Sequence, residues 1–395
     1  MTEASTSIIR PESQPCVGVI GGGQLAQMMA EAARSLDVDL VIQTPNNSDP
    51  AVSFATKSFI GEITDAGVTA ALAKYCDVIT FENEFVDLSV LQPLAQKGVC
   101  FRPPLQTLAV LLDKYEQLFH LQQWGLPTPA FQAIDSVTEL LRPNVHQQFP
   151  LVLKSRRHGY DGQGTWVIPD QKALESIQDK LSNTPLLLQA FVPFERELAV
   201  IGVRSVSGEV AIYPVVETHQ IDQVCRWVVA PADLPPALTE EIEKIARIFL
   251  QHSEAVGLFA IELFLTTDQR ILINEVAPRT HNSGHFSLDA CHTSQFEQHL
   301  RAVCGLPLGN PSLKIPGAVM VNLLGYEYAK DEYSTQRARL STIPGAVVHW
   351  YGKSESRPGR KLGHVTVQLQ ASNSQARQSE ARVAIQQVEA IWYQY

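Results

Sequence analysis

The chain has 395 residues, of which 45% are hydrophobic and 18% charged, with a formal net charge of −10 at pH 7. This length allows two or three domains, and the composition is that of an ordinary globular protein. The negative charge disfavours general binding to nucleic acids or membrane surfaces, because phosphates would be repelled. No apolar run is long enough to span a membrane. Residues 1–15 are predicted to form a flexible polar leader rather than a signal peptide. Six scattered cysteines without a C-x-x-C pair favour a cytoplasmic location.

Strand-like and helix-like segments alternate in the N-terminal part of the chain. Strands are predicted at 16–20, 39–44 and 76–85, and helices at 24–36 and 65–75. This alternation predicts an open parallel sheet with helices between its strands. We therefore expect a Rossmann-like α/β domain over residues 16–112.

A single helix is predicted next, because six apolar side chains would share one face of it: Leu108, Leu111, Leu112, Tyr115, Leu118 and Phe119. Thr107 would be its N-cap and Gly125 its end, and we place a domain boundary near it. The region 149–305 then indicates an antiparallel α+β unit. Its strands are expected at 150–155, 164–168, 186–192, 197–203, 211–216, 259–265 and 271–277, and its helices at 239–257 and 294–305. The remaining domains would be 113–308 and a small β-rich domain at 309–395.

The segment VGVIGGGQLAQMM places three glycines between a strand and a helix. Gly21 and Gly23 would let the backbone approach a phosphate at the helix N-terminus. An NAD site normally has an acidic residue at the end of the second strand, whereas this strand ends in Gln43 and Thr44. NAD is therefore disfavoured, while a structural turn and another phosphate site both remain open.

Lys154 ends an apolar strand and precedes the glycine-rich loop GYDGQGT, residues 159–165. A charged side chain in such a strand needs a partner or a function. The loop could close over a ligand and offer backbone N–H groups to phosphates. A phosphate-covering lid and an exposed hairpin turn are both compatible with this pattern.

The sequence FAIELFLTTDQRILINEVAPR predicts a hairpin that turns at 266–269. In a regular ladder Glu275 would face Ala260 and lie diagonal to Glu262 on the same face of the sheet. Carboxylates inside apolar strands are costly unless they are neutralised. Mg²⁺ is the favoured partner, because it prefers oxygen ligands and bridges carboxylates to nucleotide phosphates. The alternative is a pair of salt-bridged carboxylates, with Arg279 as one partner.

Several polar residues follow the second strand of this hairpin: Arg279, His281, Asn282 and His285. A zinc site built from His281, His285 and either Cys291 or His292 lacks a recognised ligand spacing. An anion or substrate pocket is a better use of these side chains, and hydrogen-bonded loop histidines remain the alternative.

The segment YGKSESRPGRKLGH concentrates basic side chains in an acidic protein: Lys353, Arg357, Arg360 and Lys361. Arginine and lysine beside turn glycines suit phosphate oxygens, so a phosphate clamp competes here with a solvated basic loop. The sequence contains no G-x-S-x-G, Walker A or protein-kinase motif. The pattern therefore indicates Mg-nucleotide chemistry on another scaffold.

Taken in this order, the motifs resemble the ATP-grasp superfamily and, within it, the 5-(carboxyamino)imidazole ribonucleotide synthetase family, the ATPase subunits of phosphoribosylaminoimidazole carboxylase. The matching segments are GGGQL, TFENE, GYDGQGT, INEVAPRTHNSGH and RPGRKLGH, and the similarity extends from about Val17 to His364. The resemblance implies an ATP-grasp fold with a Rossmann-like N-terminal domain and a small β-rich C-terminal domain. It also implies the carboxylation of 5-aminoimidazole ribonucleotide with ATP and bicarbonate, through carboxyphosphate, in purine biosynthesis. Mg²⁺ and a cytoplasmic homodimer are further implications.

The resemblance assigns roles in ATP binding. Lys114 and Lys154 would contact the phosphates, and Glu197 the ribose. Metal binding would fall to Glu262 and Glu275, with Asn274 beside them. The lid and the adenine-binding linker are longer sets: Gly159, Tyr160, Asp161, Gly162, Gln163, Gly164 and Thr165 for the lid, and Gln189, Ala190, Phe191 and Val192 for the linker.

It also assigns the other substrates. Arg279 and His281 would hold bicarbonate or carboxyphosphate, and Tyr160 and Asp161 would face the aminoimidazole. The remaining contacts to this nucleotide would come from Lys353 and Arg360 at its phosphate, from Gln24 and Leu25 along the pocket, and from Glu84. The glycine turn would then serve a ribonucleotide monophosphate rather than NAD.

Two positions depart from the family pattern. The chain has ETHQID at 217–222 where members often have ENIHRD, so the contact made by His219 or Gln220 is unassigned. Ala277 replaces the Asn of the E-x-N metal strand found in many ATP-grasp enzymes, as it does throughout the purine carboxylase branch.

The alternatives are a formate-dependent glycinamide ribonucleotide transformylase, which the RPGRKLGH segment disfavours, and a nucleotide-sensing module, which intact Arg279 and His281 disfavour. An oxidoreductase is a distant third.

Overall fold

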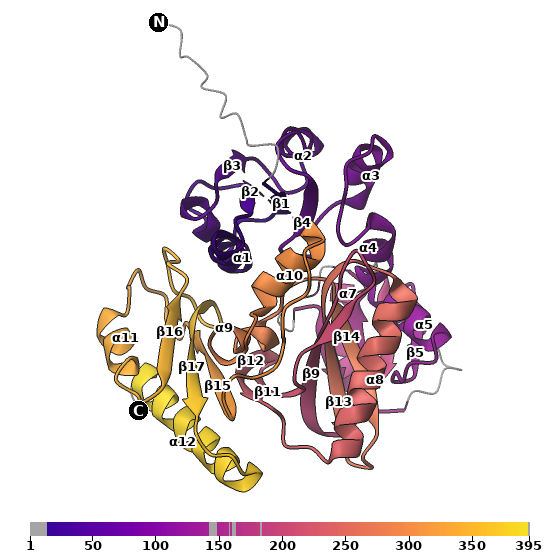
Figure 1. Ribbon diagram of the computed structural model, residues 1–395. Coiled ribbons are helices and arrows are strands. Elements are labelled where there is room, and N and C mark those ends of the chain that lie inside the picture. Colours follow the sequence, from indigo (N-terminus) through magenta and orange to yellow (C-terminus); the bar gives the residue numbers. More distant parts are fainter. Residues whose placement is uncertain (1–13, 142–147, 158, 160–162, 182–183, 394–395) are drawn as a thin grey trace, which may run out of the picture.

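The computed structural model describes residues 14–141, 148–157, 159, 163–181 and 184–393. Within this part of the chain the strands form three sheets. Figure 1 shows the N-terminal unit at the top, the central unit at the right and the C-terminal unit at the left. None of the described helices is long and apolar enough to cross a membrane. Three predicted lid residues, Tyr160, Asp161 and Gly162, lie outside the described residues.

The N-terminal sheet is parallel, with the strand order β3-β2-β1-β4, which confirms the predicted α/β unit. Its strands are β1 (Cys16–Ile20), β2 (Asp39–Thr44), β3 (Lys57–Ile60) and β4 (Val78–Phe81). The accompanying helices are α1 (Gln24–Ser35), η1 (Pro50–Ser53), α2 (Ala66–Leu72) and α3 (Leu88–Gln96). The sequence analysis missed β3, because this edge strand is partly exposed and has no continuous apolar pattern.

The single helix predicted around residues 108–119 is wrong. The structure has two helices, α4 (Leu105–Leu111) and α5 (Lys114–Gln123), and Thr107 lies inside the first of them. Asp113 separates them, because its carboxylate accepts the N–H groups of Tyr115 and Glu116 at 3.0 and 3.3 Å and so caps α5. Gly125 follows the end of α5 in the left-handed conformation (φ 70°), as predicted for a helix stop.

The central sheet is antiparallel and has the order β14-β13-β9-β11-β12-β15-β17-β16, with β10 paired to β9. The strands are β9 (Phe194–Arg204), β10 (Val210–Ile212), β11 (Val216–Ile221), β12 (Val224–Ala230), β13 (Gly257–Thr266), β14 (Ile271–Ala277), β15 (Gly317–Leu324), β16 (Ala346–Trp350) and β17 (Lys361–Leu369). The strand predicted at 211–216 is interrupted at Pro214, which has no N–H group for a ladder. The C-terminal strands extend this same sheet through the pairing of β12 with β15.

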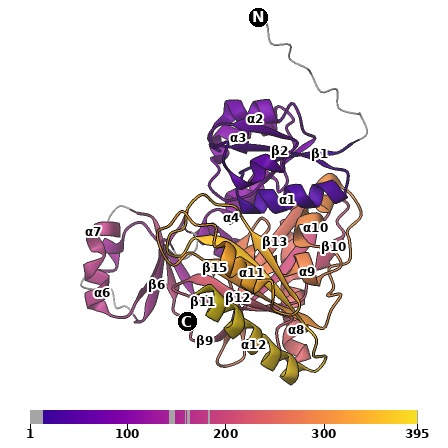
Figure 2. The same cartoon turned by 90° about the vertical axis from the view of Figure 1, so that its left-hand side faces the viewer.

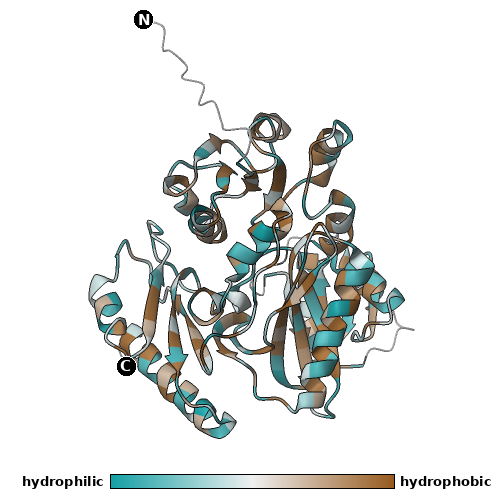
Figure 3. Cartoon of the chain, viewed as in Figure 1, coloured by the Kyte–Doolittle hydropathy of each residue, from teal (hydrophilic) through white to brown (hydrophobic). Residues whose placement is uncertain are grey.

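Helices cover the central sheet and connect the units: α8 (Pro236–Ser253), η3 (Asn282–Gly284), α9 (Ser287–Ala290), α10 (Gln295–Cys304), α11 (Ser334–Leu340) and α12 (Ser374–Trp392). Helix α8 is amphipathic, and hydrophilic colours mark much of its outer surface in Figure 3. Helix α10 lies directly below the N-terminal unit (Figure 1), whose core includes Phe296, Leu300 and Val303 from this helix. Residues at the start of α10 are therefore held between two units.

A smaller antiparallel sheet, in the order β5-β8-β6-β7, forms a separate lobe. It consists of β5 (Phe131–Ile134), β6 (Leu151–Ser155), β7 (Thr165–Ile168) and β8 (Leu186–Ala190), with η2 (Val137–Glu139), α6 (Gln171–Ser176) and α7 (Gln178–Leu181). Figure 2 shows this lobe projecting sideways from the rest of the molecule. Lys154 lies in β6, and the described end of the glycine-rich loop leads into β7, so both belong to this lobe.

Asp113 connects the lobe to α5. Besides capping the helix, its buried carboxylate accepts from Nε of Arg156 at 2.9 and 3.1 Å. We predict that Asp113→Ala lowers the free energy of unfolding by about 2–4 kcal/mol, because it removes a cap and leaves the guanidinium without its main partner. Chemical denaturation measures this. Asp87→Ala is the control, since Asp87 caps α3 at an exposed position through Ser89. Equal losses in the two variants would contradict the role given to the ion pair.

Candidate active site

The two predicted metal-binding carboxylates face each other directly. In the β13–β14 ladder Glu262 pairs with Glu275, and the register shifts between Glu262 and Leu263. The predicted register is therefore wrong, because Glu275 faces Glu262 and Ala260 faces Ala277. The two-residue difference has two causes. At the turn Leu265 pairs with Ile271 rather than with Arg270, and a β-bulge then leaves Asn274 as an extra residue. Together they turn a diagonal arrangement into a directly facing one.

A third carboxylate lies on the same face of the sheet. Glu262 pairs with Ala199 of β9, and Glu197 is two residues from Ala199, so Glu197 points to the same side. Burial, together with Glu262, raises the pKa of Glu197 to about 7. Burial, together with Glu275, raises the pKa of Glu262 to about 7. Glu197 and Glu262 therefore hold their protons to a higher pH than free carboxyl groups do, as expected where carboxylates are brought together.

Two lysines compensate part of this negative charge. Lys114, the first residue of α5, forms an ion pair with Glu275. Lys154 is 7% exposed, and its Nζ donates to Oδ1 of Asn274 at 2.8 Å. Burial and the charge of Lys114 lower the pKa of Lys154 to about 8. Burial alone would raise the pKa of Glu275, but the two lysines outweigh it and the pKa is lowered. The salt-bridge alternative named Arg279 as a partner, but Glu275 pairs with Lys114, and Arg279 pairs with Glu84.

Arg279 and His281 lie in the loop after β14, next to this cluster. Nε of Arg279 donates to Glu84 at 2.7 Å, and Nη1 donates to the Thr280 carbonyl at 3.0 Å. Nε2 of His281 lies 3.5 Å from Oε1 of Glu262. Burial, together with Arg279, lowers the pKa of His281 well below its usual value, so this ring is neutral at pH 7. A neutral donor and a fixed guanidinium beside the carboxylates form a pocket suited to a small anion.

The glycine turn is filled by a side chain of the protein itself. Glu82 accepts the N–H groups of Gly23 and Leu25 at 2.7 and 3.1 Å, at the N-terminus of α1. A Cβ on Gly21 or Gly23 would come within 2.5 Å of this carboxylate, which explains why glycine is needed there. The expectation that this helix end binds the substrate phosphate therefore conflicts with the structure. Gln24 and Leu25 begin the same helix, and Glu84 lies near it through its pair with Arg279.

The described part of the glycine-rich loop lies against Lys114. A Cβ on Gly159 would meet the Gln163 carbonyl at 2.9 Å and Cε of Lys114 at 3.5 Å. Gly164 adopts φ +81° and Thr165 begins β7. The linker prediction falls on the end of β8, with Gln189 and Ala190 inside the strand and Phe191 and Val192 directly after it. Oε1 of Gln189 is buried without a hydrogen-bond partner among the described residues.

The basic segment joins β16 to β17. Nη1 of Arg360 donates to the carbonyl of Glu355 at 2.9 Å, and Nζ of Lys353 lies 5.6 Å from the ring centre of Tyr351. Lys361, the first residue of β17, was predicted only as one of the basic side chains of a phosphate clamp or a solvated loop. Its charge nevertheless acts on Glu262 and His281 in the anion pocket. Lys361 thus extends the positive charge of this segment toward the carboxylates.

Gln117 is another residue that the sequence analysis missed. Its buried amide donates to the carbonyls of Val276 and Leu111 and accepts the N–H of Val276, at 2.7–2.9 Å. It therefore holds the peptide that follows Glu275. No local pattern could have indicated this, because the partners are separated by 159 residues.

Among the described residues, the group of at least three His, Cys, Asp or Glu side chains with mutually close ligand atoms is Asp289, His349 and His364, rather than the zinc group considered from sequence. The two imidazole rings stack, with centroids 4.4 Å apart and planes 12° from parallel. A metal bound by both rings would have to lie in both planes, which stacked rings do not allow. Nε2 of His349 instead pairs with Asp289 at 2.9 Å, and Nδ1 of His364 with the Tyr351 hydroxyl at 2.8 Å. We interpret this group as a hydrogen-bonded network.

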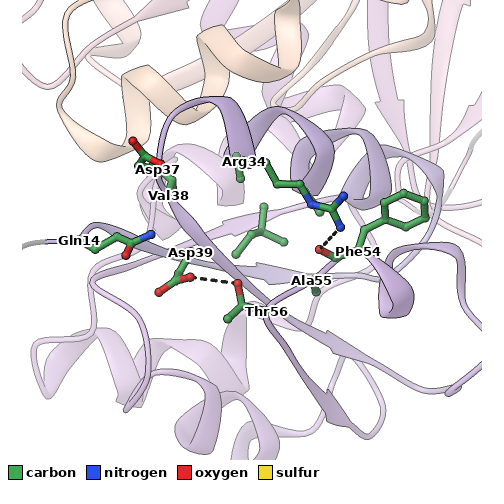
Figure 4. A pocket seen from close by; sticks show the side chains of 11 residues that line it. Gln14, Arg34, Asp37, Val38, Asp39, Phe54, Ala55 and Thr56 are labelled. Atoms are coloured by element: carbon green, nitrogen blue, oxygen red, sulfur yellow. Dashed lines mark hydrogen bonds between the residues drawn. The ribbon is translucent and has the colours of Figure 1, made fainter. Parts of the chain in front are cut away.

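A cavity of about 410 Å³ in the N-terminal unit is lined by α1, β2 and the chain after η1. Figure 4 shows Arg34, Asp39 and Thr56 around it, with Thr56 hydrogen-bonded to Asp39 at 3.1 Å. None of the predicted site residues lines this cavity. The charged groups that could perform chemistry gather instead on β13, β14 and the loop after β14, where the charge of Lys361 also acts.

Family models match three successive parts of the chain: a ribonucleotide synthetase pre-ATP-grasp domain at 15–111, an ATP-grasp domain at 119–296 and a phosphoribosylaminoimidazole carboxylase C-terminal domain at 318–379. The N5-carboxyaminoimidazole ribonucleotide synthase of Synechococcus elongatus is 54% identical over 376 residues, which is 95% of each chain. The chain belongs to the N5-carboxyaminoimidazole ribonucleotide synthase family. It is therefore an ATP-grasp ligase of purine biosynthesis.

Solved structures of this synthase family agree in fold. The carboxyaminoimidazole ribonucleotide synthase of Aspergillus clavatus, complexed with ATP, has a TM-score of 0.88 and 32% identity, covering 96% of this chain and 99% of that one. The same fungal enzyme with ADP and 5-aminoimidazole ribonucleotide has a TM-score of 0.86 and 31% identity, covering 97% of this chain and 99% of that one. The predicted ATP-grasp fold with its two flanking units is confirmed.

The carboxylate cluster predicts a pH-dependent stability. The pKa of Glu262 is raised from 4.5 to about 7, so the folded state retains a proton that the unfolded chain releases. The stabilisation is fully present below pH 4.5 and is lost as the pH rises through about 7. We predict that Glu262→Gln raises the melting temperature of ligand-free protein at pH 8 but not at pH 4.5. Calorimetry measures this, with Glu195→Gln at an exposed site as control. A lower melting temperature for Glu262→Gln at pH 8 would refute the charge crowding.

Proposed function

We propose that the chain carboxylates 5-aminoimidazole ribonucleotide on its exocyclic amine, using ATP and bicarbonate through carboxyphosphate. The observation that supports this most strongly is the contact between two kinds of site: Nε2 of His281 lies 3.5 Å from Oε1 of Glu262. A pocket for a small anion therefore adjoins the carboxylates suited to Mg-ATP. This arrangement fits the transfer of a phosphoryl group from the nucleotide to the anion.

Mg²⁺ fits the residues present. Glu262 and Glu275 face each other, and a cation between them would relieve the crowding that raises the pKa of Glu262. When bound, Mg²⁺ would neutralise charge on the nucleotide phosphates. Lys114 and Lys154 would contact the same phosphates, and the loop with Gly159 lies next to Lys114. Glu197 would bind the ribose, and a donor on adenine would satisfy the buried Oε1 of Gln189.

The anion pocket would hold bicarbonate in line with the γ-phosphate. The ion pair with Glu84 fixes the plane of Arg279, and its second terminal nitrogen would take the anion. The neutral His281 ring would donate through Nε2, because its Nδ1 already accepts the N–H of Ser283. A bicarbonate oxygen attacks the γ-phosphorus, the bond to the ADP oxygen breaks, and carboxyphosphate forms. Positive charge preorganised around this group stabilises it, and the closed lobe excludes water.

Carboxyphosphate then breaks its carbon–oxygen bond to give CO₂ and phosphate. The amine of 5-aminoimidazole ribonucleotide forms the new carbon–nitrogen bond to CO₂ and loses a proton. Lys353 and Arg360 would hold the ribose phosphate of this substrate, a role strengthened because Glu82 already occupies the helix end at the glycine turn. Tyr160 and Asp161, which lie outside the described residues, would face the imidazole.

The assembly and location are part of the same proposal. The family resemblance implies a homodimer in the cytoplasm. Sedimentation of the purified protein tests the first point, where a monomer at micromolar concentration would contradict it, and cell fractionation tests the second.

ADP release from Mg-ATP and bicarbonate, measured with and without 5-aminoimidazole ribonucleotide, tests the function. We predict strong stimulation by this nucleotide together with formation of its carboxylated product. In Lys353→Ala, KM for the nucleotide should rise about tenfold or more, because a charge-assisted phosphate contact is lost, while ATP affinity stays unchanged.

Lys330→Ala serves as the matched control, since Lys330 is an exposed lysine of the same C-terminal unit. ADP release that is indifferent to the aminoimidazole nucleotide would leave an ATP-grasp ligase with another acceptor. A selective loss of ATP affinity in Lys353→Ala would overturn the phosphate assignment.

A further inference from the structure

A buried glutamine at the start of α10 pairs with the peptide backbone of His281. Oε1 of Gln295 accepts the N–H of His281 at 2.9 Å, and Nε2 donates to the His281 carbonyl at 2.7 Å. His281 lies in the loop between β14 and η3. The side-chain amide thus makes the two hydrogen bonds with its backbone that a neighbouring strand would make in a sheet. Gln295 is 0% exposed, so no solvent competes for these bonds.

The orientation of this amide follows from its partners. An N–H and a carbonyl of the same residue face it, so a flipped amide would place donor against donor and acceptor against acceptor. The second hydrogen of Nε2 points to Nδ1 of His285, 3.0 Å away. His285 must then accept at Nδ1, which agrees with a buried neutral ring. Every hydrogen-bonding group of the Gln295 amide is therefore engaged by the segment that carries the anion pocket.

The position of Gln295 is itself secured. Its backbone N–H donates to Oγ of Ser287 at 2.9 Å, and the next residue, Phe296, is packed in the core of the N-terminal unit. Gly284 lies so close that a Cβ there would come within 2.6 Å of Oε1 of Gln295. The loop, η3 and α10 are consequently packed around this one amide.

We infer that Gln295 is a positioning residue, which places His281 relative to Glu262 and the bicarbonate pocket. This inference rests on the function proposed above. A side chain such as His281 must keep the position of the bound reactant within a fraction of an ångström. A displacement of about 1 Å can lower the rate on the order of 10²-fold. The clamp acts on the backbone of His281, whereas Ser283 orients its ring through Nδ1.

The same helix provides a matched control. Gln298, one turn further along α10, is also 0% exposed and pairs in the same way with a peptide, that of Gly309. Its Nε2 donates to the Gly309 carbonyl and its Oε1 accepts the Gly309 N–H, both at 2.8 Å. Gly309 lies in the connection between α10 and β15, which carries none of the residues assigned to the active site. The two glutamines thus share helix, burial and a two-bond pairing with one residue's backbone, and they differ in the backbone that they hold and in the further bond from Gln295 to His285.

The test compares Gln295→Met with Gln298→Met in the full-length protein. Methionine keeps the length of the side chain and removes both hydrogen-bonding atoms. We expect similar losses of melting temperature, but in Gln295→Met alone a fall of about 10- to 100-fold in kcat/KM for bicarbonate. KM for ATP should stay within about twofold in both variants. Amide hydrogen exchange, followed by mass spectrometry without substrates, should rise at 278–285 in Gln295→Met and near residue 309 in Gln298→Met.

Equal kinetic effects in the two variants, or unchanged exchange at 278–285 in Gln295→Met, would overturn the inference. If Gln295→Met does not fold, Gln295→Asn replaces it, because it keeps the amide but is one carbon too short to reach, and Gln298→Asn becomes its control. Wild-type protein without bicarbonate-dependent turnover would refute the proposed function instead, and the exchange data would still decide whether Gln295 holds His281.

Discussion

Two carboxylates that face each other inside an antiparallel sheet are the constraint on which the rest of the site depends. The turn of the hairpin and the bulge at Asn274 set Glu262 opposite Glu275, and like charges that face each other in a partly buried position are unstable without compensation. The protein supplies part of it with Lys114 and Lys154, which come from α5 and from the smaller lobe. A divalent cation would neutralise the negative charge that remains, and it could at the same time bind the phosphates of a nucleotide.

This charge requirement explains why several units converge on one place. The lobe contributes Lys154, the central sheet the carboxylates, and the C-terminal segment Lys361, whose field reaches Glu262 and His281. The N-terminal unit contributes Glu84, which pairs with Arg279 across the boundary. The small anion pocket therefore arises where oppositely charged residues from separate units neutralise one another.

Local patterns in the sequence indicated the N-terminal sheet, the acidic hairpin and the acidic and basic residues of the site. The alternation of strand and helix predicted the parallel sheet, and the charges inside the hairpin predicted that Glu262 and Glu275 belong together. The predictions that were wrong concern geometry that is set by contacts between residues far apart in the chain. The helix break at Asp113 is hidden by apolar periodicity that continues across it, and the β13–β14 register depends on a bulge. The amides of Gln117 and Gln295 and the carboxylate of Glu82 contact residues far along the chain, so no spacing rule could find them.

The proposed function requires that the nucleotide and the anion meet so that ATP phosphorylates bicarbonate. The most direct measurement is the fate of oxygen from ¹⁸O-labelled bicarbonate during turnover with Mg-ATP and 5-aminoimidazole ribonucleotide, read as isotopic composition of the released phosphate at short times. Attack of bicarbonate on the γ-phosphorus predicts one labelled oxygen in each phosphate formed. Unlabelled phosphate accompanying the carboxylated product would contradict the account, because the phosphoryl group would then have gone to another acceptor.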